Sequence, residues 1–569
     1  MKSTLIYFLI FLTLLLFVFR SLVFNLDTNL IDWRDYALMV WIIFQNISKI
    51  LSLDLGNFFN TTAFYPNPYS LLFSDLLLPQ SIMALPFYLI TKNLILTFNI
   101  VFILTFILNY FSLFLFWRII LKKNILAFIG AMLFIFSPFF HLNISHFQML
   151  SYWPFFFSLY FLFKAGENRS LKTYALCGLF ITIQFLSSVY LSVYLLTAIS
   201  IYFFLKFLKR KNLNIRIGGV LIILVTFVLT SGIFIKGYLD MKNYYDVQRD
   251  IGEYITYSAS LSDYVFSFSV NSLLYNLSPL EKWNSFNKNG WGGHAAFPGF
   301  LIIILSAIGL FSIKREKIGL SLFMTLDWNK AFFLIAALTG FIFSLGPRLN
   351  FNGTYAQIPL PYTIIMKIVP LFESVRVSAR WSYLLYFGLI FFSLIGLQKL
   401  AKGRNPRLIY VLVFMFLILE FIPLNLKSTA ESYYDDRTFT VQDLCLNQEK
   451  VLLEIPVTHL EAGNNIAEGL SYITKSQLAS SVHNCPMFNG YSGYDLPSIT
   501  ELSQKVNLNI EQNNTEQFVI LMREKGISIV KFNPESFPPL KQPGLQTFLT
   551  TLTKTAGIEQ IETTIFTIK

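Results

Sequence analysis

Long apolar runs separated by short basic clusters dominate this sequence of 569 residues. Apolar side chains make up 54% of the chain and charged ones only 13%, against about 25% charged residues in a typical soluble domain. A helix that crosses a bilayer needs about 20 mainly apolar residues, because lipid offers its backbone groups no hydrogen-bond partners. The pattern therefore predicts an α-helical polytopic membrane protein.

The basic clusters set the predicted orientation. Nearly all of them fall on one side if residues 76–90, which contain Pro79 and Pro86, lie along the outer interface instead of crossing. The positive-inside rule makes that side cytoplasmic. The chain is then a multi-pass protein of the plasma (inner) membrane with a cytoplasmic N-terminus. About eleven spans follow, at residues 5–19, 94–117, 126–140, 150–163, a helical pair over 174–205, 217–235, 298–313, 331–345, 381–398 and 408–424.

The net charge of +12 has the same origin. In a soluble protein it would suggest nucleic acid as a partner, but no basic-aromatic module accompanies the charge here. The expected partner is the lipid bilayer, and no nucleic acid is expected.

Two domains are expected from a change of composition near residue 425. Residues 1–424 form the transmembrane domain, with an outer loop over 25–93. Residues 425–569, the tail, are polar and mixed and long enough to bury a core. Strand patterns at 451–456 and 527–532 and a helix pattern at 518–525 predict a small extracytoplasmic α/β domain. Outside the cytoplasm, Cys445 and Cys485 can form a disulfide, although both can equally stay free.

Asp32 and Asp35 in the outer loop are the leading candidates for chemistry. On a helix that begins near Ile31, these two positions share one face. Two carboxylates just outside a span can deprotonate an acceptor hydroxyl or hold a divalent cation; capping of the helix start is the alternative. Asp75, after Ser74 at the start of a second interfacial helix, is a further candidate, with an N-cap as its alternative.

Two pairs of basic side chains are further candidates on the outer face. His141 and His146 can contact a phosphate or ligate a metal, although their spacing suits ligation poorly; plain interfacial side chains are the alternative. Arg376 and Arg380 lie one turn apart before the span at 381–398, where the positive-inside rule disfavours them. A phosphate group would explain them, and pairing with Glu373 or a loop aspartate would do so equally.

The layout resembles the GT-C superfamily of integral-membrane glycosyltransferases. One span, a long outer loop with an acidic residue, interfacial helices, further spans and an extracytoplasmic tail occur in that order. The chain also resembles uncharacterised bacterial multi-span GT-C-like proteins. The stretches that carry this likeness are Phe64-Tyr65-Pro66, Ser74-Asp75, Ser137-Pro138 with His141 and His146, Phe297-Pro298-Gly299, Leu345-Gly346-Pro347, Arg376 with Ala379-Arg380, and Asn489-Gly490-Tyr491-Ser492-Gly493.

The resemblance implies an inverting transfer of a sugar from a polyprenyl-phosphate donor to an acceptor on the outer face. The base would be Asp35, with Asp32 as the alternative, and Arg376 and Arg380 would lie near the donor phosphate. The loop departs from the superfamily in having no Asp-Glu or Glu-x-Asp pair. Arg34 can pair with either aspartate, which leaves the identity of the base and any divalent cation open.

Two other functions fit the same layout. A transporter or flippase of lipid-linked saccharides usually shows repeats and polar residues at mid-membrane; here no repeat is evident, and Glu420 is the notable acidic residue within a span. A non-catalytic assembly protein of the cell envelope, whose tail binds envelope partners, is the third function.

Overall fold

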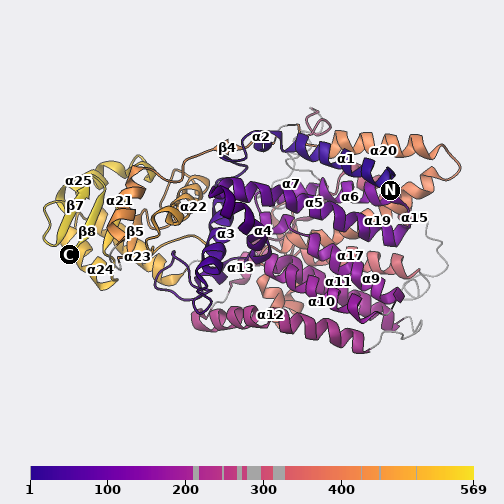
Figure 1. The fold of residues 1–569 in the computed structure, drawn as a ribbon, viewed down its shortest axis with the longest axis horizontal. Coiled ribbons are helices and arrows are strands. Elements are labelled where there is room, and N and C mark those ends of the chain that lie inside the picture. The colour runs from indigo at the N-terminus through magenta and orange to yellow at the C-terminus, as the bar shows by residue number, and fades with distance from the viewer. Residues whose placement is uncertain are drawn as a thin grey trace. The chain divides into compact units, whose positions relative to one another are not determined.

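The computed structural model groups the chain into two compact units (Figure 1). The helical unit contains Met1–Phe24, Phe102–Phe234 and Asp246–Lys427, and the mixed unit contains Asn25–Val101, Ile235–Tyr245 and Ser428–Lys569. The structure describes residues 2–168, 170–208, 217–246, 249–265, 272–277, 296–311, 327–424, 426–446, 450–494 and 496–569.

The long helices of the helical unit run alongside one another (Figure 1). Helices α5 and α12 also contribute residues to the mixed unit, and strands β2 (Arg348–Phe351) and β3 (Thr354–Pro359) form a hairpin. The helices are α1 (Lys2–Val18), α2 (Arg20–Val23), α5 (Leu94–Leu121), α6 (Asn124–Ile135), α7 (Pro138–Leu142), α8 (Phe147–Leu150), α9 (Trp153–Asn168), α10 (Leu171–Ser187), α11 (Val189–Leu208), α12 (Ile217–Tyr245), α13 (Ile251–Thr256), α15 (Phe300–Phe311), α17 (Trp328–Ser344), α18 (Pro361–Ile368), α19 (Ser382–Ala401) and α20 (Pro406–Phe421).

Helix α19 is the core of the helical unit and packs against α15 and α17. Gly309 on α15 faces the carbonyl of Phe392, and Gly396 on α19 faces the carbonyl of Leu305. A Cβ atom at either glycine would collide with that carbonyl oxygen. Small residues let membrane helices approach closely where apolar burial gives little driving force between them.

Each predicted span coincides with a helix. The expected pair over 174–205 is confirmed, because α10 ends at Ser187 and α11 begins at Val189. Within the part of the chain that the structure describes, five helices are long and apolar enough to cross a membrane by length and composition: Leu94–Leu121, Asn124–Leu142, Val189–Leu208, Gly218–Tyr245 and Ser378–Ala401. The number of about eleven spans and the orientation stay predictions. Some basic clusters behind the orientation, such as Lys314, Arg315 and Lys317, lie outside the described residues.

The mixed unit contains a four-stranded sheet in the order β5-β6-β8-β7. Strands β5 (Leu452–Ile455) and β6 (Ile529–Phe532) are parallel, while β8 (Ile565–Ile568) is antiparallel to β6 and to β7 (Ile558–Glu562). The two strands and the helix expected in the tail are confirmed by β5, β6 and α24. The helices here are α21 (Asp436–Cys445), α22 (Ile466–His483), α23 (Pro497–Glu511), α24 (Thr515–Glu524) and α25 (Gln542–Leu552).

Cys445 and Cys485 form a disulfide in the mixed unit. The bond joins the end of α21 to the segment after α22, next to a core cluster that includes Val441, Leu452 and Met487. Of the two alternatives that the sequence left open, the structure contains the bonded one. Cys177 is a buried free thiol in the helical unit.

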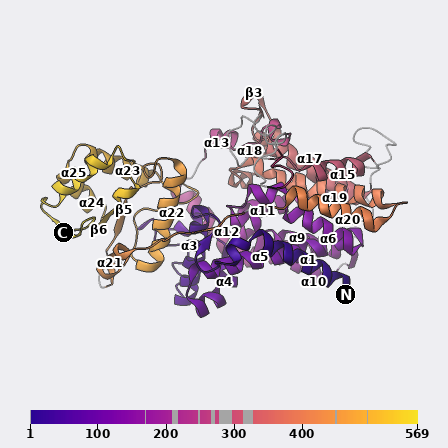
Figure 2. The same ribbon diagram turned by 90° about the horizontal axis from the view of Figure 1, so that it is seen from above.

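The outer loop packs on the tail within the mixed unit. Helix α3 (Asp35–Ser52) lies against α22 in both views (Figures 1 and 2). Trp41 Nε1 on α3 donates to Ser480 Oγ at 3.0 Å, and β1 (Asn29–Leu30) pairs antiparallel with β4 (Thr429–Ala430). Helix α4 (Leu78–Thr91) packs on α3 in turn. This association was not foreseen, and the division into domains at residue 424 stays a prediction.

Candidate functional site

Asp32 and Asp35 do not share a helix face, so the sequence prediction on this point is wrong. Helix α3 begins at Asp35. Arg34 donates to Asp32 from its backbone N–H, from Nε and from Nη2, each at 2.9 Å. Such a local side-chain turn competes with helical backbone bonding and holds Asp32 outside the helix. The hydrogen bond to Asp32 is also the main reason that the pKa of Arg34 is raised.

The two aspartates therefore differ in their environment. The Asp32 side chain is only 7% exposed and is engaged by the Arg34 fork. Asp35 is half-buried in the first turn of α3, where the helix dipole favours an anion. Arg34 thus pairs with Asp32.

Trp33 ties this acidic segment to the tail. Its Nε1 donates to the carbonyl of Thr429 at 2.8 Å, and its own carbonyl accepts from Thr474 Oγ1 at 3.1 Å. Its ring lies 6.4 Å from that of Tyr433, between centroids. The segment from Asp32 to Asp35 is therefore held by residues more than 390 positions away in the sequence.

Asp75 lies in the mixed unit, half-buried, three residues before α4 begins at Leu78. Leu77 occupies the cap position of α4, so the alternative that Asp75 is an N-cap is wrong. The neighbouring Ser74 carbonyl accepts from the hydroxyl of Tyr238 on α12 at 3.2 Å.

The two histidines lie in the helical unit. His141 is on α7, and its Nε2 lies 2.8 Å from the carbonyl oxygen of Phe421 at the end of α20. This contact requires a proton on Nε2 and gives His141 a structural role. His146 is half-buried at the start of α8. The roles expected for the two histidines, phosphate contact or metal ligation on one side and plain interfacial side chains on the other, stay predictions.

Arg376 and Arg380 lie in the helical unit, on the segment that leads into α19. The Arg376 guanidinium lies 5.1 Å from the ring centroid of Tyr257, and that of Arg380 lies 5.5 Å from the ring of Tyr190. Both tyrosines pack on one small core cluster that includes Val377. Stacking on a ring helps to orient a planar guanidinium, which is the side-chain group that can bind phosphate bidentately. We call these four side chains the arginine–tyrosine cluster.

The sequence did not decide whether this protein binds a divalent cation. Among the residues that the structure describes, no three His, Cys, Asp or Glu side chains gather as a ligand set. The Asp32 carboxylate is also engaged by Arg34. The described residues around Asp32 therefore offer no ligand set for a divalent cation.

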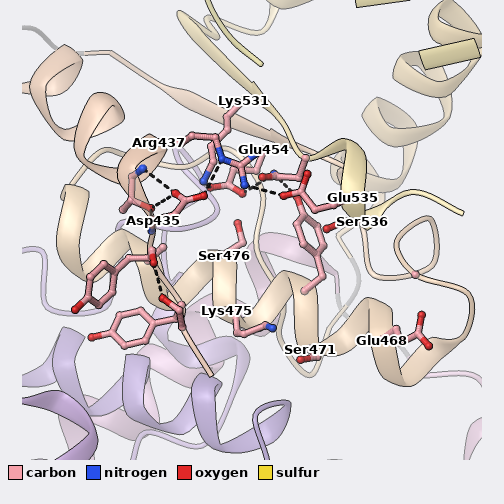
Figure 3. Close-up of a pocket in the computed structure, with 18 residues that line it drawn as sticks. Asp435, Arg437, Glu454, Glu468, Ser471, Lys475, Ser476, Lys531, Glu535 and Ser536 are labelled. Carbon is pink, nitrogen blue, oxygen red and sulfur yellow. Dashed lines mark hydrogen bonds and ion pairs between the residues drawn. The ribbon is translucent and has the colours of Figure 1, made fainter. Parts of the chain in front are cut away.

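A polar pocket of about 430 Å³ lies in the mixed unit, and sequence reasoning missed it (Figure 3). In its lining, Lys531 Nζ lies 3.2 Å from Glu454 Oε1, and Asn533 donates to Glu454 Oε2 at 3.1 Å. The Glu454 and Lys531 side chains are 1% and 7% exposed. A signal was present, because each of two otherwise apolar predicted strands carries one charged residue.

Other ion pairs and tyrosines complete the lining of the pocket. Arg437 bridges Asp435 and Glu535, at 2.7 Å each. Ser471 and Lys475 lie on α22 at one side, and Glu454 and Lys531 lie at the other (Figure 3). Burial raises the pKa of Glu454, but the charges of Lys531 and His483 together with hydrogen bonds from Ser476 and Lys531 outweigh it, so the pKa is lowered and the carboxylate stays ionised at neutral pH.

His483, at the end of α22, is expected to make the mixed unit acid-sensitive. Burial lowers its pKa from 6.5 to about 4, and its Nδ1 accepts from the N–H of Cys485 at 3.0 Å. Between these pH values the unfolded chain binds the proton and the folded chain does not, so stability is lost as pH falls. At about 1.4 kcal/mol per pKa unit, the loss between pH 6.5 and 4 approaches about 3 kcal/mol.

Hydrogen exchange of strand β5 in the full chain, corrected for intrinsic exchange rates, checks this expectation. In the wild type, the protection of β5 should fall between pH 6.5 and 4. In the His483→Gln variant, most of this fall should be absent. An unchanged pH dependence in the variant would show that His483 is not responsible.

Comparisons with known proteins fit the fold just described. The chain is similar to the cryo-EM structure of the arabinofuranosyltransferase AftD from Mycobacteria, with a TM-score of 0.56 and 11% identity over 99% of this chain and 37% of that one. It is also similar to the archaeal oligosaccharyltransferase AglB from Archaeoglobus fulgidus, solved with an inhibitory peptide and a dolichol-phosphate, at a TM-score of 0.45 and 11% identity over 96% and 71%. The curated proteins contain no sequence match.

The first of these likenesses shows the fold, and the chain spans 37% of that enzyme's length. Together with the five helices among the described residues that are long and apolar enough to cross a bilayer, it defines a membrane protein with a GT-C-like fold. Residues 4–424 match the family described as a domain of unknown function (DUF6311), and the chain belongs to that family.

Proposed function

We propose that this protein is a membrane glycosyltransferase that moves a sugar from a polyprenyl-phosphate donor to an acceptor on the outer face. The observation that carries the proposal is a half-buried acidic residue, Asp35, at the start of the first helix of the outer loop in a GT-C-like fold. Arg34 pairs with Asp32, which favours Asp35 over Asp32 as the base.

The proposed reaction is a single inverting displacement. Asp35 accepts the proton of an acceptor hydroxyl while that oxygen attacks the anomeric carbon of the donor sugar. The bond from this carbon to the phosphate oxygen breaks, and the polyprenyl phosphate leaves with the electron pair. Arg376 and Arg380 stabilise the negative charge of the leaving phosphate.

Two observations support the proposed topology, with a cytoplasmic N-terminus and the outer loop and tail outside a plasma (inner) membrane. The loop and tail pack in one compact unit, as residues on the same side of a membrane can. The Cys445–Cys485 disulfide suits an oxidising compartment outside the cytoplasm.

Glu420, the acidic residue that most favoured a transporter, has a structural role. Glu420 is fully buried and accepts from the N–H groups of Phe300 and Leu301 at 2.5 and 2.9 Å. Its Oε1 also accepts from the hydroxyl of Tyr275 at 2.7 Å. The carboxylate therefore caps the N-terminus of α15, and this structural role accounts for an acidic residue in a span.

Replacement of the two arginines tests donor binding. Arg376→Ala and Arg380→Ala should each raise the KM for the polyprenyl-phosphate sugar about tenfold or more, since a charge-assisted contact contributes about 1.5–3 kcal/mol. Arg376→Lys should fall between alanine and arginine, because lysine keeps the charge and loses the planar fork.

Lys367→Ala is the matched control, because Lys367 is an exposed basic residue of the same region on α18. The KM of this variant should equal that of the wild type. If both arginine variants fold correctly and keep the wild-type KM, the arginine–tyrosine cluster does not bind the donor phosphate.

A further inference from the structure

We propose that the pocket on the tail binds a neutral, hydroxyl-rich saccharide, and that this saccharide is the acceptor of the transfer. The binding claim stands on the pocket itself, while the word acceptor rests on the proposed function. A volume of about 430 Å³ falls within the range of about 300–1,000 Å³ that is usual for small-molecule sites.

The charges of the pocket favour a neutral ligand. Among the described residues, three cationic and four carboxylate side chains line it. Each cation has a carboxylate partner: Lys531 with Glu454, Arg437 with Asp435 and Glu535, and Lys475 with Glu431 just outside the lining, at 2.9 Å. A phosphate or other anion would have to compete with these carboxylates and face their repulsion.

Sugar hydroxyls suit such a lining because each can donate and accept a hydrogen bond. They can donate to carboxylate oxygens and accept from the lysine, arginine and amide N–H groups beside them without breaking the ion pairs. Tyr472 extends this network, since its hydroxyl accepts from Asn533 Nδ2 at 2.9 Å.

Tyrosine rings give the pocket apolar surface as well. Tyr433, Tyr434 and Tyr472 all line it, and Tyr434 is 45% exposed. The rings of Tyr433 and Tyr434 meet edge to face at 4.9 Å between centroids. Ring faces beside paired polar groups match a pyranose or furanose, which presents C–H groups on its faces and hydroxyls at its edge.

Burial of the Glu454–Lys531 pair needs a reason other than stability. Taking both charges out of water costs several kcal/mol, and packed apolar residues at such positions are often as stable or more so. The pair lies on adjacent strands in direct register, Glu454 opposite Lys531, and both side chains line the pocket. A fixed array of donors and acceptors for a polar ligand is such a reason.

Helix α22 connects this pocket with the acidic segment of the outer loop. Ser471, Tyr472 and Lys475 line the pocket, whereas Thr474 donates to the carbonyl of Trp33 at 3.1 Å. Tyr433 of the lining also lies against the ring of Trp33. A saccharide bound in the pocket is therefore held on the same structural frame that positions Asp35.

Oligosaccharides released from the envelope of the producing cell provide the test. They are separated by anion exchange into neutral and acidic fractions, labelled with a fluorophore, and titrated by fluorescence polarisation with the full chain in nanodiscs. The wild type should bind components of the neutral fraction. Tyr434→Ala and Lys475→Ala should weaken that binding about tenfold or more, equivalent to about 1.4 kcal/mol.

The control is Lys505→Ala, which removes a lysine from a comparable exposed ion pair on α23, with Glu501 at 2.6 Å. This variant should bind like the wild type, and hydrogen exchange of strand β5 reports folding in every sample. The proposal is overturned if the wild type binds only the acidic fraction or neither fraction. It is also overturned if both pocket variants bind the neutral fraction as tightly as the wild type. If the neutral fraction binds, both pocket variants bind it more weakly and no sugar is transferred, then the pocket is a saccharide site but the proposed enzyme activity is wrong.

Discussion

Asp35→Asn is expected to lower the rate of sugar transfer by about 10²–10⁴-fold, the usual contribution of a general base. Asparagine has nearly the same shape as aspartate but cannot take the proton of the acceptor hydroxyl. The change also removes an anion from the first turn of α3, which costs only about 0.3–1 kcal/mol. The loss should therefore appear in kcat, with KM for the donor and the folding of the chain largely kept.

Two further aspartate variants make this expectation specific. Asp54→Asn alters another aspartate of the same loop, which pairs with Lys49 at 2.6 Å, and should keep full activity. Asp32→Asn weakens the turn held by Arg34 and should lower activity less than Asp35→Asn does. An inactive Asp32→Asn beside an active Asp35→Asn would transfer the role of base to Asp32.

Glu454→Gln is expected to destabilise the mixed unit by about 3–5 kcal/mol, because Lys531 would keep a buried charge without its counter-ion. Both side chains of the pair are less than a tenth exposed. Hydrogen exchange of β5 and β6 in the full chain would show the loss as reduced protection. The pKa of Glu454 is lowered in the folded chain, so its carboxylate stabilises the fold above the pKa of the unfolded chain. This stabilisation is lost as the pH falls through the folded pKa. Glu454→Gln should therefore remove this part of the acid sensitivity.

Glu501→Gln is the control for this loss, since it breaks a well-exposed pair with Lys505 and should cost less than about 1 kcal/mol. The double variant Glu454→Gln with Lys531→Met should be more stable than the sum of the two single losses. Equal effects of Glu454→Gln and Glu501→Gln would mean that the Glu454–Lys531 pair is not buried as described.

Local patterns predicted much of the secondary structure. The break of the helical pair falls at Ser187 and Ser188, and strands β5 and β6 fall on the expected apolar runs. These features depend on neighbours in the sequence, which periodicity and composition report directly. The start of α3 could not be predicted in this way, because a fork from Arg34 to Asp32 replaces the first helical turn.

Long-range pairing explains what the sequence did not reveal. The contact between α3 and α22 joins segments more than 400 residues apart, as in the hydrogen bond from Trp41 to Ser480. The pocket depends on the parallel register of β5 and β6, which sets Glu454 opposite Lys531. The charge in each strand was visible in the sequence, but the register that pairs them was not.

The most direct test of the account follows one labelled sugar. Purified protein is placed in liposomes with a radiolabelled polyprenyl-phosphate sugar and the neutral oligosaccharide fraction, and the label is then partitioned between organic solvent and water. We expect the label to move from the lipid to the oligosaccharide with wild-type protein and to stay on the lipid with Asp35→Asn. Label that stays on the lipid with the wild type, but becomes accessible to a membrane-impermeant oxidant on the opposite leaflet, would contradict the account and identify a flippase.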